Sequence, residues 1–234
     1  MSKLFTVLTF VIGFNCIVFE FLKFPEVASS FRALLFTAFF LMYFLSKGSI
    51  HKFFTSFLLF FALAELMYFA ISLDANLYYY GSIILYIMAY ASLLLYIVSK
   101  FELKKVLDSY SIHLFVLLTL NVLLVYKLDT FLINDMEDEL PLIIRLVELL
   151  YNLLLAMIAG AAFIRFLYFK SKQAIFLFLI SVLIVFSEFI QIVFYSDTNA
   201  VLSIICTLLL LFGFYFIYEY YTLSDFDDKK IEKL

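Results

Sequence analysis

The segment ALAELMYFAISLDAN (residues 62–76) carries one glutamate, Glu65, deep in an apolar run that ends at an Asp-x-Asn turn. The segment VFSEFIQIVFYSDTN (residues 185–199) has the same layout, with Glu188 at the matching position. In both segments an aspartate follows the glutamate by nine residues and an asparagine follows it by eleven. A charged side chain at the centre of a bilayer costs about 2.5–3.5 kcal/mol even on lenient scales. Two acids at matching positions therefore need an explanation.

The composition around these segments is that of a polytopic membrane protein. Hydrophobic residues make up 66% of the 234 residues and the mean hydropathy is +1.10, against about 45–50% apolar residues in ordinary globular domains. A hydrocarbon core about 30 Å thick needs roughly 20 residues of helix, and only helices and closed barrels satisfy their own backbone in lipid. Eight apolar segments approach that length, at about residues 4–22, 28–45, 53–73, 77–98, 111–128, 142–168, 174–195 and 199–223.

We therefore predict an all-α membrane protein with eight transmembrane helices. Seven spans is the alternative, because the uninterrupted apolar part of the second segment is only Ala33–Leu45. The membrane domain covers residues 1–223, with halves at 1–108 and 109–223, and a charged tail follows at 224–234.

Basic residues give the orientation. With eight spans, twelve of the sixteen Lys and Arg residues fall on the side of the N-terminus, which the positive-inside rule places in the cytoplasm together with the C-terminus. Lysine greatly outnumbers arginine, which together with the Phe and Tyr content favours an AT-rich bacterial genome. We expect a multi-pass protein of the bacterial cytoplasmic (inner) membrane.

The two halves also resemble each other, which predicts a parallel 4+4 internal repeat. The third and seventh segments align without gaps from their glutamates to their Asp-x-Asn turns. The first and fifth match in outline, as FVIGFNCIVF from Phe10 and VLLTLNVLLVY from Val116, so that Asn15 and Asn121 become equivalent.

Intramembrane polar residues gather at one depth. At 1.5 Å per residue, they lie roughly 6–17 Å below the outer surface. They are Asn15, Glu65, Asn121, Arg145, Glu148, Asn152, Glu188 and Gln191, and Tyr68 shares the helical face of Glu65. Since such groups normally face a bundle interior or water, we predict a polar cavity open to the outer side.

Plainer explanations stay open for each group. Arg145 and Glu148 are spaced for an ion pair within one helix. Asn15 and Asn121 can each form a hydrogen bond that only joins two helices. The two central glutamates would also be tolerated as protonated, hydrogen-bonded structural acids.

The chemistry available to the chain is narrow. A protonated and an ionised carboxyl group together can act as general acid and base, and the same pair serves proton-coupled transport. The two histidines lie on the inner side and cannot build a zinc hydrolase centre, and no G-x-S-x-G, P-loop or dinucleotide motif occurs. We predict no metal, no cofactor and no nucleic-acid partner.

Four sequence features carry a family resemblance. They are Ala64-Glu65, Ser187-Glu188, the run GSIILYIMAY from Gly81, which ends at Tyr90, and the segment Tyr151–Met157. With these features the chain resembles the YhhN-type lysoplasmalogenases, membrane proteins of about eight helices. The resemblance implies hydrolysis of the vinyl-ether bond of lysoplasmalogens, with Glu65 and Glu188 as the acid pair. The family has aspartates at both acid positions and usually a histidine at the position of Tyr90, so this chain departs from the pattern at all three.

The leading hypothesis is an integral membrane hydrolase that acts on an ether lysolipid or a similar amphiphile, with a membrane lipid as its binding partner. Glu65 and Glu188 would be catalytic. Substrate-binding candidates are Asn15, Asn121, Arg145, Glu148, Asn152, Gln191, Tyr68 and Tyr90. The alternatives are a non-enzymatic multi-pass subunit with protein partners in the membrane, and a small proton-coupled carrier.

Overall fold

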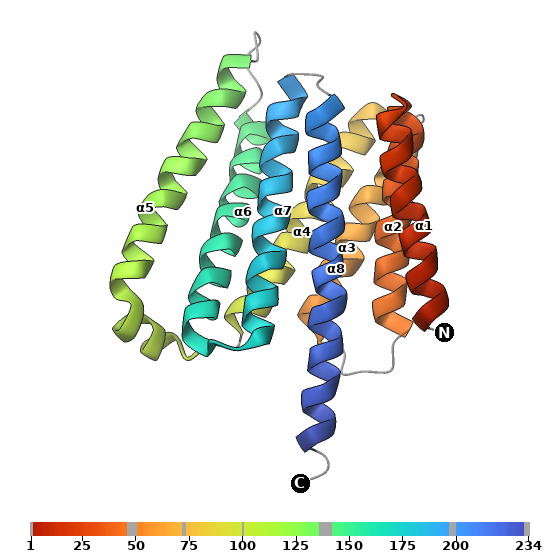
Figure 1. Ribbon diagram of the computed structural model, residues 1–234. Helices are drawn as coiled ribbons and strands as arrows, with labels where there is room; N and C mark the ends of the chain where they lie inside the picture. Colours follow the sequence, from red (N-terminus) through yellow and green to blue (C-terminus); the bar gives the residue numbers. More distant parts are fainter. Residues whose placement is uncertain are drawn as a thin grey trace.

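The computed structural model describes residues 2–45, 51–71, 74–99, 101–135, 142–196 and 200–231, and these form an all-α bundle with no strand (Figure 1). The elements are α1 (Ser2–Phe21), α2 (Pro25–Leu45), α3 (Lys52–Leu66), the 3-10 turn η1 (Met67–Ala70), α4 (Ala75–Val98), α5 (Leu103–Asp135), α6 (Leu142–Phe169), α7 (Lys172–Ser196) and α8 (Ala200–Ile231). The prediction of an all-α membrane protein of about eight helices is confirmed.

Helix lengths agree with membrane crossing. Among the residues described, six helical segments are long and apolar enough to span a bilayer, and two shorter apolar helices, Val7–Phe21 and Val201–Ile217, accompany them. The weak second segment qualifies as Pro25–Leu45, and its proline stands at the first helical position, where the missing N–H costs nothing. The chain is thus a multi-pass membrane protein.

Two helices differ from the predicted ranges. The predicted 111–128 segment is the centre of the longer α5, which bends at Tyr110, where the backbone is non-helical (φ −125°, ψ 23°). The predicted tail at 224–234 begins as a continuation of α8, which runs to Ile231 and projects beyond the bundle (Figure 1).

Helix contacts correspond between the two halves. α1 packs on α2 as α5 packs on α6, α2 on α3 as α6 on α7, and α3 on α4 as α7 on α8. The cross-half contact of α4 with α6 has its counterpart in α8 with α2. This arrangement is consistent with the parallel 4+4 repeat. The symmetry is broken at the edge, because α1 also contacts α8, whereas α5 lies outermost beside α6 (Figure 1).

The start of α4 is capped as its sequence indicates. The Asp74 side chain accepts a hydrogen bond from the Leu77 N–H (3.3 Å), which satisfies one free donor at the start of α4. The matching turn of the second half, residues 197–199, lies outside the described residues.

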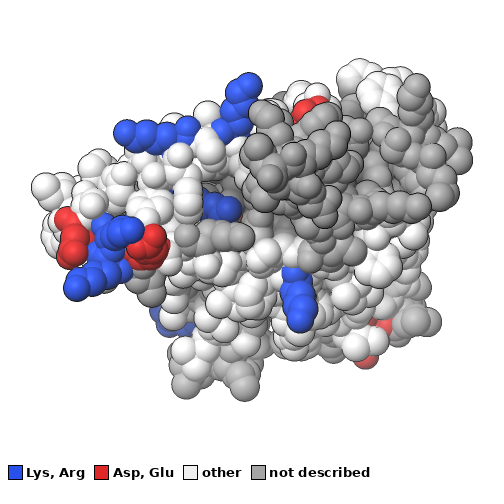
Figure 2. Space-filling view, turned by 90° about the horizontal axis from the view of Figure 1, so that it is seen from below, with Lys and Arg blue, Asp and Glu red and all other residues white. Residues whose placement is uncertain are grey.

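Both termini lie at the same end of the bundle (Figure 1). α3, α5 and α7 begin there and α6 ends there, and these helix ends carry Lys52, Lys104, Lys105, Lys170 and Lys172. Figure 2, a view of this end, shows several basic side chains on its surface. The charge asymmetry predicted from the sequence therefore coincides with one face of the folded chain.

An aromatic core fills the centre of the bundle. The Phe61 ring of α3 lies 5.1 Å from the ring of Phe36 on α2, and 5.3 Å from the ring of Phe214 on α8. All three side chains are fully buried, and each such aromatic pair adds about 0.5–1.5 kcal/mol beyond area burial. Because Phe61 stands one turn before Glu65, this core supports the acid from the end of the bundle that carries the termini.

Candidate functional site

Glu65 lies in the last turn of α3 and is held from two neighbouring helices. Arg32 Nε of α2 donates to its Oε2 at 3.0 Å, which forms an ion pair, and the Tyr86 hydroxyl of α4 donates to its Oε1 at 2.8 Å. The Glu65 side chain is 3% exposed and that of Arg32 is 25% exposed. Both carboxylate oxygens are therefore engaged, and the charge of Glu65 is neutralised by a guanidinium within the membrane domain.

Glu188 occupies the matching position on α7 with different partners. Its Oε1 accepts a hydrogen bond from the Tyr90 hydroxyl of α4, and its Oε2 accepts one from the Tyr151 hydroxyl of α6 at 2.5 Å. Glu188 is 4% exposed. Among the described residues no basic side chain forms an ion pair with it. The two acids thus share a position in their sequence segments but differ in their surroundings.

α4 connects the two acids. Tyr86 and Tyr90 stand one turn apart, and their rings are stacked with centroids 6.0 Å apart and an interplanar angle of 11°. The Tyr151 ring lies 5.7 Å from the Tyr90 ring and 6.4 Å from the Tyr86 ring. These contacts define what we call the acid–tyrosine network, made of Arg32, Glu65, Tyr86, Tyr90, Glu188 and Tyr151. It draws on five helices, and the acids are linked through the tyrosines and not through a hydrogen bond to each other.

Aromatic rings and a hydrogen bond between two helices surround the network. The Phe61 ring packs edge-on against Tyr86 (5.4 Å) and Tyr90 (6.2 Å). Ser187, next to Glu188, donates to the Cys206 carbonyl (3.3 Å), which attaches α7 to α8 behind the acid. Since hydrogen bonds are electrostatically stronger in a low dielectric, the network is well suited to hold its side chains in one arrangement.

Several predicted site residues lie on the rim of this network. Asn152 is buried (2% exposed) and directly follows Tyr151 on α6. Glu148, one turn earlier, accepts a hydrogen bond from the Tyr79 hydroxyl of α4 at 2.6 Å. The Tyr68 hydroxyl donates to the Glu26 carbonyl at 3.1 Å.

The other four candidates have different surroundings. The Asn15 amide donates to the Val11 carbonyl of its own helix at 2.8 Å. Asn121 of α5 lies against Gly160 of α6, where an added Cβ would stand 3.3 Å from its Nδ2. Arg145 is exposed and Gln191 is half-buried.

The structure therefore brings Glu65, Glu188 and Tyr90 together, with Asn152 beside them. It leaves Asn15 and Asn121 on the peripheral helices α1 and α5.

Three members of the network were absent from the predicted site: Arg32, Tyr86 and Tyr151. In the count of basic residues, Arg32 is one of the four that fall on the side opposite the N-terminus. An arginine seven residues into an apolar helix needs a buried acid, and this is the signal that identifies it as a partner. The tyrosines carried no comparable signal, because tyrosine at a membrane interface is common.

Two hollows accompany the site. A cavity of about 550 Å³ lies at the ends of α2 and η1 and is lined by Glu26, Val27, Ser30, Tyr68, Phe69 and Ile71. Ser30 stands two residues before Arg32, and Tyr68 stands three residues after Glu65. This cavity therefore adjoins the ion pair, although neither charged side chain lines it.

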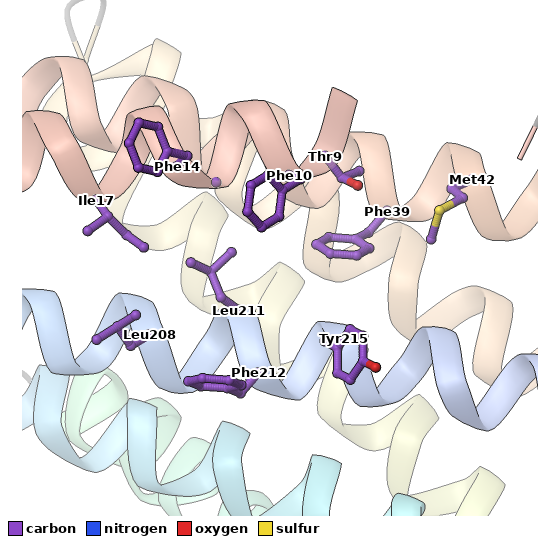
Figure 3. Close-up of a pocket in the computed structure, with 11 residues that line it drawn as sticks. Thr9, Phe10, Phe14, Ile17, Phe39, Met42, Leu208, Leu211, Phe212 and Tyr215 are labelled. Carbon is purple, nitrogen blue, oxygen red and sulfur yellow. The ribbon is translucent and has the colours of Figure 1, made fainter. Parts of the chain in front are cut away.

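An apolar groove of about 470 Å³ runs between α1, α2 and α8, with Phe10, Leu211 and Phe212 among its walls (Figure 3). No network residue lines it.

Searches of protein-family models, curated proteins and solved structures find no match to this chain. Within the described residues no group of three His, Cys, Asp or Glu side chains is placed to hold a metal ion. What the site offers chemically is a pair of buried carboxyl groups, one with a cationic partner and one with phenolic donors only. Such a pair can divide the roles of base and acid.

Proposed function

We propose that the protein is a membrane hydrolase that uses Glu65 and Glu188 as base and acid on an ether lysolipid. One observation carries this proposal: two buried acids at matching positions of α3 and α7 sit in different electrostatic settings. Glu65 faces a guanidinium and Glu188 faces only tyrosine hydroxyls. Pairs of carboxyl groups whose surroundings differ in this way are characteristic of acid–base catalysis.

The reaction that suits this pair is hydrolysis of a vinyl ether. Protonated Glu188 gives its proton to the outer vinyl carbon, which leaves an oxocarbenium ion. Water then adds to the carbon bonded to the ether oxygen and loses a proton to the Glu65 carboxylate, which produces a hemiacetal. In the last step Glu65 protonates the departing ether oxygen while Glu188 takes the hemiacetal proton. The products are an aldehyde and a glycerophospho-base, one water is consumed, and both acids return to their first states.

Residues around the acids have clear tasks in this scheme. Arg32 holds the Glu65 carboxylate in place, and Tyr90 and Tyr151 fix both oxygens of Glu188. The cavity beside Glu26 and Tyr68 gives an amphiphile an approach from the end of the bundle opposite the termini. In a bacterial cytoplasmic membrane, the basic end would face the cytoplasm and this approach would face the outer side.

The same geometry counts against a carrier. A proton-coupled carrier needs a path from the acids to the inner side, and that direction is closed by the buried rings of Phe36, Phe61 and Phe214. The hydrolase is therefore the better-supported function.

The test is aldehyde release from a 1-alkenyl lysophospholipid by the purified protein in lipid nanodiscs. Glu65→Gln and Glu188→Gln should each lower the rate by about 10²–10⁴-fold, the usual worth of a general acid or base. Glu219→Gln is the matched control, since Glu219 contacts Tyr215 near the inner end of α8 and lies outside the network. No aldehyde from the wild-type protein, or full rates in both network variants, would refute the proposal.

A further inference from the structure

Two buried polar atoms on α4 and α6 have no hydrogen-bond partner. They are the Ser82 hydroxyl oxygen and the Asn152 side-chain carbonyl oxygen. Polar groups buried in a protein interior are almost always hydrogen-bonded, and each exception needs an explanation. In lipid the need is greater, because no bulk water reaches the hydrocarbon region.

The two atoms belong to adjacent, parallel helices, and the contacts between these helices indicate their alignment. The Tyr79–Glu148 hydrogen bond and the Arg165–Tyr96 hydrogen bond both join α4 to α6 across a separation of 69 residues in sequence. Applied to Ser82, this register places residue 151 opposite it, and the ring contacts of Tyr151 with Tyr86 and Tyr90 place the facing position up to about two turns nearer the start of α6. Asn152 therefore lies one position beyond the range of α6 residues that these contacts place opposite Ser82.

The two residues also lie on facing sides of their helices. Ser82 stands on one stripe of α4 with Tyr79 and Tyr86, at spacings of three and four residues, and both of these tyrosines contact α6. Asn152 stands four residues after Glu148, which is the residue of α6 that Tyr79 contacts. The two partnerless oxygens accordingly face the seam between α4 and α6.

Serines on α2, α4 and α7 show that Ser82 is unusual. Ser30, Ser92 and Ser181 each donate to the carbonyl four residues earlier, at 2.8–2.9 Å. That self-contained bond is the ordinary way for a serine to be satisfied inside a helix. Ser82 makes no such bond, so its hydroxyl remains free to interact across the seam.

We propose that Ser82 and Asn152 form a binding site for a single hydroxyl group between α4 and α6. The hydroxyl donates its hydrogen to Asn152 Oδ1 and accepts one from Ser82 Oγ, which satisfies both buried atoms at once. Two sources have this chemistry: a water molecule, or the free hydroxyl of a lysolipid glycerol. The site adjoins Tyr151, which binds Glu188. The lipid source rests on the proposed function, whereas the hydroxyl site itself does not.

Binding of a non-reactive probe distinguishes the sources. The probes are 1-O-hexadecyl-glycerophosphocholine, which has a saturated ether and a free 2-hydroxyl, and its 2-O-methyl analogue. Apparent affinities come from the shift of the unfolding temperature of the purified full-length protein with probe concentration. If the glycerol hydroxyl occupies the site, the free-hydroxyl probe binds about fivefold to tenfold more tightly than the 2-O-methyl probe. This difference corresponds to the net contribution of one hydrogen bond. Ser82→Ala and Asn152→Leu then remove this preference.

Ser92→Ala is the matched control, because Ser92 lies on the same helix but bonds to its own backbone. It should leave the probe preference unchanged, and the small Ser82→Ala change keeps the test valid if Asn152→Leu does not fold. If water occupies the site, both probes bind equally, and an experimental density map that resolves waters shows one bonded to both oxygens.

Equal binding of the two probes together with no water between Ser82 and Asn152 would overturn the site. Neither probe carries a vinyl group, so the result does not depend on hydrolysis. A failure of the proposed function, seen as no aldehyde release, is therefore distinguishable from a failure of this inference.

Discussion

Replacing Arg32 by methionine should destabilise the protein, because it leaves the buried Glu65 carboxylate without its cation. Removing one partner of a fully buried ion pair costs about 3–5 kcal/mol. The Glu65 side chain is 3% exposed, but a quarter of the Arg32 side chain reaches its surroundings. Solvent screening reduces the value of such a pair, so we expect a loss of about 2–3 kcal/mol in the free energy of unfolding.

The measurement is equilibrium unfolding of the purified protein in mixed micelles, with two companion variants. Arg32→Met combined with Glu65→Gln should recover most of the loss, since a neutral amide leaves no unpaired charge. Lys105→Met is the matched control, because it breaks the Lys105–Glu102 ion pair, in which both side chains are about two-thirds exposed, and it should leave stability nearly unchanged. The reasoning fails if Arg32→Met is as stable as the wild type, or if the double variant is no better than the single one.

Three further outcomes follow from the same structure. Tyr90→Phe and Tyr151→Phe each remove one donor to a buried acid and leave an oxygen of it unsatisfied, so each should cost about 1–3 kcal/mol in micelle unfolding, and neutral effects of both would contradict the hydrogen bonds described. Phe61→Ala should cost about 3–5 kcal/mol in the same assay, because it opens a hole in the aromatic core beneath Glu65, and a loss below about 1 kcal/mol would show that the core is not close-packed there. A cysteine at Lys104 should react with a membrane-impermeant maleimide only in inside-out vesicles, and one at Leu77 only in intact cells; the reverse pattern would invert the orientation inferred from the basic residues.

The helices were predictable because hydrophobicity is a collective property of about 20 residues. Each apolar segment signalled a span whatever its neighbours were, and Asp74 marked the start of α4 through ordinary capping chemistry. Glu65 and Glu188 were predictable because they interrupt such segments. An acid inside an apolar span has a large free-energy cost, which other groups of the protein must offset.

The partners of these acids depend on packing, which periodicity does not encode. Asn15 and Asn121 share the depth of the acids, but their helices lie at the edges of the bundle, and depth alone does not fix a helix's neighbours. Tyr86 and Tyr151 look like any membrane tyrosine until α4 and α6 are seen together. Only Arg32 carried a signal of its own, because a basic residue inside a span requires an acid nearby.

The ion pair between α2 and α3 also bears on how the chain enters the membrane during synthesis. Arg32 adds about 2.5–3.5 kcal/mol to the insertion free energy of a span if it stands near the middle, and less near the interface. The Glu65 carboxylate that neutralises it belongs to the next helix to be made. The α2 segment is therefore expected to stay at the translocon until α3 emerges, so that the two helices partition into lipid as one hairpin.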